Sequence, residues 1–372
     1  MGISVRVAAL CTVAVSIACS GDPVVGVLCP TSGDDSAYGR SVDNGIRLAV
    51  ADATAAEAIP ADLQILRYDT RSRADVAVTA FRRLATEERA RLVIGGVTPE
   101  EVRALSPLAD EHGVIFVSPI ARPTTEGSDD PLVYRMFAGD EVEGATAARF
   151  LYEDRSVRRL ILFTDNSGFS RGLETEFRQQ YQLRLDGVVE TTVHLREPEW
   201  ETVAADALHG HRPAGVFIVG HAERILEVLR FLDARQFRGV RCTTSAFYVA
   251  DVLDRAGEIA EGVFLPVFGF DPSAGEAAAG GFASRYRETY GGAPDLYAAH
   301  GYDAMGVVLR SLLLARDVTT KELRRVLSVR LRDFAGATGL LSFDEAGDVR
   351  RYPVMHVVWK GRIRPSAEVL RG

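Results

Sequence analysis

Residues 92–119 read LVIGGVTPEEVRALSPLADEHGVIFVSP, and this stretch decides the fold class. Its two apolar ends, Leu92–Gly95 and Val114–Val117, are predicted strands, because each is short, rich in β-branched residues and apolar at nearly every position. Between them Pro99–Glu111 is a predicted helix, since Thr98 suits the capping position, a proline follows it, and a carboxylate stands three residues after the cap. Strands that are apolar throughout are typical of a parallel sheet with helices on both faces.

The same alternation of strand and helix extends outward from this stretch to both ends of the chain. The other predicted strands are Val24–Cys29, Leu63–Tyr68, Leu160–Thr164, Gly187–Val193, Gly215–Val219, Gly262–Phe268 and Val354–Trp359. The other predicted helices are Gly39–Ala55, Arg73–Thr86, Asp140–Tyr152, Ser170–Leu185, Glu199–Leu208, Arg224–Gln236, Gly280–Tyr290, Tyr297–Arg316 and Thr320–Leu327. Repeated strand–helix–strand units predict an α/β fold built on parallel sheets.

Length and composition narrow the classes of protein further. The chain has 372 residues, 47% of them hydrophobic and 25% charged, which suits a globular protein of two domains. Its formal net charge is −8 and no tract is rich in Lys or Arg, so we expect no nucleic-acid partner. The histidines and cysteines show no metal-ligand spacing and the Gly26 region lacks the dinucleotide-binding glycine pattern, so we expect no metal and no cofactor.

The N-terminus has the features of an export signal. Arg6 supplies a positive charge, and Val7–Ile17 is apolar or small throughout but too short to span a bilayer. A small residue and then Cys19 follow, which resembles the lipobox of bacterial lipoproteins, although Ser16 stands where leucine is usual. We expect an exported protein, lipid-anchored at Cys19 and located in the periplasm or at the cell surface. A plain secretory signal with an incidental cysteine is the alternative.

Two cysteines remain beyond this leader. Cys29 and Cys242 each lie at the end of a predicted strand, and we assign the two strands to different halves of the protein. A disulfide between them would lock the halves together, so we expect two free and buried thiols.

The junctions that follow the strands are where a ligand site is expected. In a parallel α/β sheet the strand-to-helix junctions gather at the carboxyl edge, where ligands bind. The loops at Thr98 and at Ser118 are such junctions, and a helix that starts there offers free N–H groups.

Short motifs along the mature chain resemble those of one family in the same order and spacing. They are VVGVL at 24–28, Tyr38-Gly39, Asn44-Gly45, Tyr68-Asp69, LVIGG at 92–96, Val117-Ser118-Pro119, Phe163-Thr164-Asp165 before Gly168-Phe169, Ala260-Glu261-Gly262-Val263, Tyr302-Asp303-Ala304, and GLLSFD at 339–344 before Gly347-Asp348. The chain thus resembles the type I periplasmic solute-binding proteins, the leucine/isoleucine/valine-binding protein family, in its bacterial lipoprotein form.

This resemblance implies two doubly wound lobes joined by three hinge crossovers that close around a ligand. The crossovers are expected near Phe137–Asp140, near Pro266–Phe270 and between Leu340 and Arg351. The implied division of the chain is a signal peptide at 1–18, a lipid-anchored tether at 19–22, lobe 1 at 23–138 plus 268–342, and lobe 2 at 139–267 plus 343–372. A monomer is expected.

The resemblance also indicates which residues face the ligand. The expected ligand-binding residues are Tyr38, Thr98, Pro99, Ser118, Ile120, Arg122, Phe169, His221, Ser245, Phe247 and Tyr297. Several depart from the amino-acid binders of the family, in which a serine stands at the position of Pro99, a threonine at that of Arg122 and an acidic residue at that of Ser245. We therefore expect a small organic ligand, amino-acid-like or with a carboxylate and an aromatic body, whose anionic group Arg122 would hold.

Three functions fit these features. The first is a binding protein, not an enzyme, that delivers its ligand to the membrane subunits of an ABC-type importer. The second is a sensor or regulator of the same fold that acts on a membrane or cell-wall partner. The third and weakest is a serine hydrolase, because Gly168–Gly172 matches GxSxG. That motif requires its serine directly after a strand, whereas Asp165–Gly168 intervene here and Ser170 is expected to cap a helix.

Overall fold

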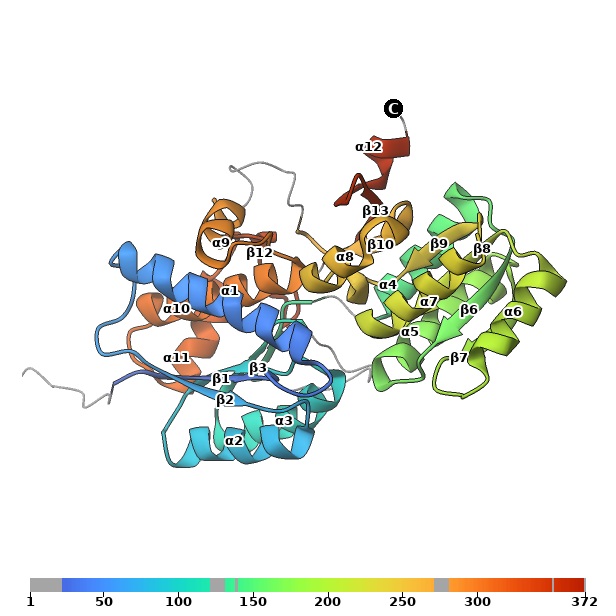
Figure 1. Cartoon of the computed structure of the whole chain (residues 1–372). Coiled ribbons are helices and arrows are strands. Elements are labelled where there is room, and N and C mark those ends of the chain that lie inside the picture. The colour runs from blue at the N-terminus through green and yellow to red at the C-terminus, as the bar shows by residue number, and fades with distance from the viewer. Residues whose placement is uncertain (1–21, 121–130, 138–139, 271–280, 350, 371–372) are drawn as a thin grey trace, which may run out of the picture.

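The computed structural model describes residues 22–120, 131–137, 140–270, 281–349 and 351–370. The expected signal peptide, Cys19 and Arg122 lie outside these ranges. Within them the chain forms two parallel-stranded sheets, each packed between helices, which lie side by side (Figure 1). The α/β fold class and the two-lobed architecture are confirmed.

The first sheet contains the N-terminal strands. Its order is β2-β1-β3-β4-β5, and every neighbouring pair is parallel. The strands are β1 (Val24–Cys29), β2 (Gln64–Asp69), β3 (Leu92–Gly95), β4 (Ile115–Ser118) and β5 (Val133–Arg135). The helices packed with it are α1 (Ser36–Ala55), α2 (Ala74–Thr86), α3 (Pro99–His112), α9 (Phe282–Tyr290), α10 (Leu296–Leu314) and α11 (Thr320–Arg325). A small hairpin, β11 (Phe334–Gly336) with β12 (Gly339–Leu341), packs beside α10.

Successive residues of the first sheet face two separate cores. Val27 and Ile94 pack with residues of α1 and α10, whereas their neighbours Leu28 and Val93 pack with residues of α2 and α3. Because side chains alternate between the faces of a strand, helices on both faces require apolar residues at every position. This explains the unbroken apolar runs from which the strands were predicted.

The second sheet is assembled from the middle and the end of the chain. Its order is β14-β13-β10-β9-β8-β6-β7, parallel from β7 to β10, with β13 and β14 antiparallel at one edge. The strands are β6 (Arg159–Thr164), β7 (Val188–His194), β8 (Gly215–Val219), β9 (Val240–Thr243), β10 (Val263–Val267), β13 (Val354–Trp359) and β14 (Arg362–Pro365). The helices of this half are α4 (Asp140–Arg149), α5 (Gly168–Arg178), α6 (Trp200–His211), α7 (Ala222–Ala234), α8 (Ala250–Ala256) and α12 (Ser366–Leu370).

The order of the elements takes the chain from one sheet to the other in three passages between described elements. It leaves β5 for α4, leaves β10 for α9, and leaves β12 for β13. The third passage runs beside the first, because Arg135 N donates to Gly347 O (2.8 Å) and Val349 N donates to Arg135 O (3.0 Å). The third passage is therefore bonded to the last residue of β5, the edge strand of the first sheet.

The cysteines are placed as the sequence predicts. Cys29 ends β1 of the first sheet and Cys242 lies in β9 of the second, and both are buried and free. Burial raises the pKa of each thiol well above its ordinary value.

Candidate ligand-binding site

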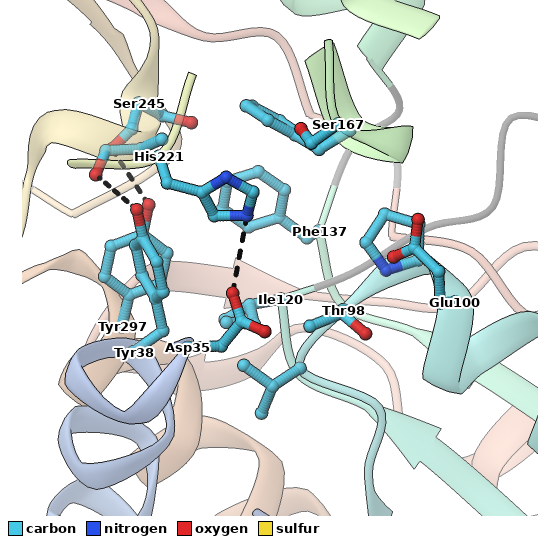
Figure 2. A pocket seen from close by; sticks show the side chains of 14 residues that line it. Asp35, Tyr38, Thr98, Glu100, Ile120, Phe137, Ser167, His221, Ser245 and Tyr297 are labelled. Carbon is cyan, nitrogen blue, oxygen red and sulfur yellow. Dashed lines mark hydrogen bonds and ion pairs between the residues drawn. The ribbon is translucent and has the colours of Figure 1, made fainter. Parts of the chain in front are cut away.

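A cavity lies between the two halves, at the carboxyl ends of their strands (Figure 2). Its volume is about 80 Å³, several times the roughly 10–15 Å³ that one water needs. From the first half it is lined by Asp35, Tyr38, Val97, Thr98, Pro99, Glu100, Ile120, Phe137 and Tyr297. From the second half it is lined by Ser167, Phe169, His221, Ser245 and Ala246. A molecule in this cavity would touch both halves at once.

Two tyrosines from the first half reach across to the second. Tyr38 stands in the first turn of α1 and Tyr297 in the first turn of α10, with their ring centroids 5.0 Å apart and edge to face. Tyr38 Oη accepts from Ala222 N (2.7 Å) and donates to Ala246 O (3.3 Å). Tyr297 Oη donates to Ser245 O (2.9 Å). Burial raises the pKa of both phenols, so both remain neutral donors.

The start of α3 supplies the next part of the wall. Thr98 is the N-cap, and its hydroxyl accepts from Glu101 N (3.2 Å), as the sequence predicts. Glu101 in turn accepts from Val97 N (3.0 Å), and Pro99 has no N–H to give. The carboxylate of Glu100 lies opposite the first turn of α5, because a Cβ at Gly168 would be 1.8 Å from Glu100 Oε1.

Three charged groups meet where the halves face each other. His221 precedes α7 in the second half, and its Nδ1 lies 2.8 Å from Asp165 Oδ2 in the same half. Its Nε2 lies 3.4 Å from Asp35 Oδ1 in the first half. Burial acts to lower the pKa of His221, but the hydrogen bond and the charge of Asp165, with further help from Asp35, raise it above the ordinary value.

The pKa values of the two carboxylates around His221 are shifted in opposite directions. Burial raises the pKa of Asp35 above its ordinary value. Burial also acts to raise the pKa of Asp165, but hydrogen bonds from His221, Ser170 and Ser167 N hold it well below the ordinary value. Asp165 is therefore a fixed negative charge at the mouth of the cavity.

An acidic residue stands directly behind Ser245. Glu143 of α4 is buried, and its two oxygens accept from Ser245 N (2.6 Å) and Ser245 Oγ (3.0 Å). Burial raises the pKa of Glu143 to about 7. Ser245 is thus held in place by a carboxyl group that itself does not line the cavity.

The structure brings most of the expected ligand-binding residues together. Around the cavity stand Tyr38, Thr98, Pro99, Ile120, Phe169, His221, Ser245 and Tyr297. Two expected residues do not line it: Ser118 is buried and bonds to Gly96 O (3.1 Å), and Phe247 is fully buried in the core. Ser118 is the last residue of β4 and Phe247 lies in the turn after β9, and both side chains are fully buried.

Sequence reasoning missed several residues of the wall. They are Asp35, Val97, Glu100, Phe137, Ser167 and Ala246. Phe137 and Val97 could have been found, since they stand next to an expected crossover and next to Thr98. Nothing in the sequence distinguishes Asp35 from its neighbour Asp34, which does not line the cavity.

The geometry around Ser170 is unlike that of a serine hydrolase. Ser167, not Ser170, caps α5, so the expected cap is wrong by one turn. Ser170 is fully buried, and its Oγ donates to Asp165 Oδ1 (2.5 Å). In a catalytic triad the histidine stands between the serine and the acid, whereas here Asp165 stands between Ser170 and His221. The Ser170 hydroxyl is bonded to Asp165 and Ser167, and no histidine in the described part of the chain contacts it.

Two further observations concern the residues that the structure describes. No group of three or more His, Cys, Asp or Glu side chains among them is arranged to hold a metal ion. No helix in the same ranges is both long and apolar enough to cross a membrane.

Comparisons with known proteins agree on one family. A family model described as periplasmic binding protein matches residues 24–359. A leucine-, isoleucine-, valine-, threonine- and alanine-binding protein of Pseudomonas aeruginosa is 22% identical over 343 residues, which cover 89% of this chain and 88% of that protein. The structure resembles a leucine-binding protein of Thermotoga maritima, with a TM-score of 0.81, 26% identity, and coverage of 92% and 97%. It also resembles the isoleucine complex of a branched-chain amino acid transporter substrate-binding protein of Streptococcus pneumoniae, with a TM-score of 0.83, 22% identity, and coverage of 92% and 98%.

Proposed function

The chain belongs to the type I periplasmic binding proteins of the Leu/Ile/Val-binding family, and from this we propose that it captures a small organic ligand between its two lobes. The observation that supports this most directly is the cavity itself, which both halves line and which is larger than one water. A ligand that touches both halves stabilises the closed form relative to the open one, because only the closed form provides all of the contacts.

The wall indicates the kind of body that the ligand carries. Tyr38, Phe137, Phe169 and Tyr297 surround the cavity with aromatic rings, and Val97 and Ile120 add aliphatic surface. Ligand sites of this kind select an apolar or aromatic body, with a few polar groups that fix its orientation. The sequence suggested a ligand carboxylate held by Arg122, which lies outside the described residues, so that part stays a prediction.

We further propose that the protein hands its ligand to the membrane subunits of an ABC-type importer. The relatives named as transporter substrate-binding proteins support this role. Export by a signal peptide and attachment through acylated Cys19 would place the protein beside such a membrane complex. The moving units in this proposal are residues 23–138 with 268–342 and residues 139–267 with 343–372.

A thermal-shift screen of small metabolites tests the capture of a ligand. At a concentration of 100 times Kd, a ligand adds about 2.7 kcal/mol to the free energy of unfolding. We expect amines, acids and amino acids with an apolar body to contain the hits. If a broad screen yields none, the proposal of ligand capture is wrong.

The Tyr38→Ala variant tests where the ligand binds. Tyr38 lines the cavity and bonds to the second half, so its removal should weaken binding at least several-fold. Tyr352→Ala is the matched control, because Tyr352 is 80% exposed and does not line the cavity. Circular dichroism shows whether each variant is folded, and equal affinities for the two variants would place the ligand elsewhere.

A further inference from the structure

The side chains of the cavity carry a surplus of negative charge. Of the lining residues that the structure describes, Asp35 and Glu100 are acidic, His221 is the one group that can be positive, and none is lysine or arginine. The ring nitrogens of His221 already face Asp35 and Asp165. With His221 protonated the three carboxylates still outnumber it, and with His221 neutral the surplus is larger.

The start of α3 adds little that could hold an anion. Proline at the first helical position provides no N–H, Glu101 N is taken by Thr98, and Val97 N is taken by Glu101. Within the first turn of α3, the N–H left without such a partner is that of Glu100, which carries a negative side chain. Among the described residues Glu100 forms no hydrogen bond or ion pair. An anionic group at this place would be repelled by the same residue that offers it a donor.

The mouth of the cleft has the same sign. Around it stand the carboxylates of Asp34, Asp35, Glu100, Asp165, Glu223 and Glu227, and the arginines 171, 196 and 224. Arg224 pairs with Glu227 (2.7 Å), whereas Arg171 and Arg196 bond to the backbone oxygens of Asn166 (2.6 Å) and Asp165 (2.7 Å) and keep their charge, so the carboxylates around the mouth outnumber the arginines by six to three. A field of one sign in a cleft concentrates ligands of the opposite charge.

The walls suit a cation as well as an apolar body. The rings of Tyr38, Phe137, Phe169 and Tyr297 border the space, and in Figure 2 Asp35 and Glu100 come from the same half, with Thr98 between them in this view. The face of an aromatic ring attracts an ammonium group, and the attraction grows when water is excluded.

We infer that the ligand is a small organic cation, a protonated amine on an apolar or aromatic body, whose charge is held by Asp35 and Glu100. This inference rests on the proposed function, since it names the chemical class of the ligand that the cleft captures. It assigns the two acidic residues of the wall a role in specificity. A ligand whose charged group is a carboxylate is disfavoured.

Probes of one shape and different charge test the inference. The set is 2-phenylethylamine, 3-phenylpropionate, 3-phenylpropan-1-ol and phenylalanine, each measured by isothermal titration calorimetry and by thermal shift. We expect the amine to bind most tightly, the alcohol more weakly and the acid not measurably, with phenylalanine weaker than the amine because of its carboxylate. Because exposed charges are screened by salt, the affinity of the amine should fall as ionic strength rises.

Charge-neutralising variants locate the contact. Glu100→Gln and Asp35→Asn should each weaken binding of the amine several-fold and leave the affinity for the alcohol nearly unchanged. Asp34→Asn is the matched control, because it removes the same charge from the mouth of the cleft without touching the cavity. Asp35→Asn also breaks the ion pair with His221. If this variant still binds the alcohol normally, its weaker binding of the amine reflects the lost charge and not a damaged cavity.

Two results would overturn the inference. The first is an acid that binds as tightly as its matched amine, which would leave ligand capture standing and reverse the charge of the ligand. The second is an amine affinity that is equal in Glu100→Gln, Asp35→Asn and Asp34→Asn. Failure of every probe also ends the assignment to amines, and the broad metabolite screen then decides separately whether the cleft captures any ligand.

Discussion

His221 forms ion pairs with a carboxylate of each half. It comes from the second half, its ring is half-buried between Asp165 of that half and Asp35 of the other, and Glu100 also contributes to its environment. A histidine between two carboxylates is more stable in its charged form. Its pKa is accordingly raised, although burial works in the opposite direction. The contact between the halves therefore depends on pH.

The pH dependence has a definite sign. A group whose pKa is raised on folding stabilises the protein fully below its unfolded value, near 6.5 for histidine, and loses this contribution as pH rises through the raised value. We predict that the free energy of unfolding, measured with urea, falls as pH rises above about 6.5, and that His221→Gln flattens this fall. His209→Gln, in exposed α6, is the control. A wild-type slope that His221→Gln leaves intact would contradict the prediction.

At the same scale, the resemblance to the family indicated Tyr38 and Tyr297, and the structure places both in the wall of the cavity. The resemblance gave no indication of Asp35 or Glu100, which also line it. Asp35 and Glu100 resemble solvated loop and helix-start residues in every local respect. Their role depends on how the halves meet, which is a property of long-range packing that no short window of sequence contains.

At the scale of elements, the crossing of α1 and α10 sets the position of both tyrosines. A Cβ at Gly45 would lie 1.9 Å from Ala298 O, and one at Gly301 would lie 2.2 Å from Val42 O. The two helices therefore touch backbone to backbone, with glycine as the residue that allows it. Because Tyr38 and Tyr297 stand in the first turns of these helices, the crossing also determines where their hydroxyls reach.

Gly301→Ala should push the helices apart. We expect it to reduce the free energy of unfolding by about 1–3 kcal/mol, the usual cost of overpacking, and to weaken ligand binding because Tyr297 moves. The control is Gly210→Ala in α6, where a Cβ meets nothing within 4 Å. That control should be more stable by roughly 0.5–1 kcal/mol, since alanine suits a helix better than glycine. Equal stabilities of the two variants in urea would refute the close crossing.

Most elements could be predicted, and each of the others escaped prediction for a physical reason of its own. Strands β1, β3, β8 and β13 begin and end where the apolar runs predict. Strand β9 was expected only as a strand that ends at Cys242, without bounds, because Arg241 interrupts its apolar residues, and β5 was missed because it is only three residues long. The predicted helix Asp140–Tyr152 corresponds to α4 followed by a wider π-type turn at Phe150–Asp154, and periodicity alone does not distinguish such a turn from the α-helix before it.

For the whole molecule, polar contacts join the two halves beside the cavity. Besides the Asp35–His221 pair they include the bonds of Tyr38 to Ala222 N and Ala246 O, and that of Tyr297 to Ser245 O. A hydrogen bond of this kind contributes about 0.5–1.5 kcal/mol. Closure is therefore an equilibrium that a small number of bonds, or a ligand, can shift.

The double variant Tyr38→Phe/Tyr297→Phe tests this equilibrium without a ligand. It removes three hydrogen bonds between the halves and keeps every ring, so the closed form loses about 1.5–4.5 kcal/mol, which is a tenfold or larger shift toward the open form. Small-angle X-ray scattering should show a larger radius of gyration than in the wild type, and the ligand affinity should fall in parallel. Tyr290→Phe is the control, because Tyr290 Oη donates to Asn44 O (3.0 Å) within the first half. Since the phenylalanines retain the packing of each half, thermal stability should change little. Identical scattering from the double variant, the control and the wild type would mean that the tyrosine hydroxyls do not govern closure.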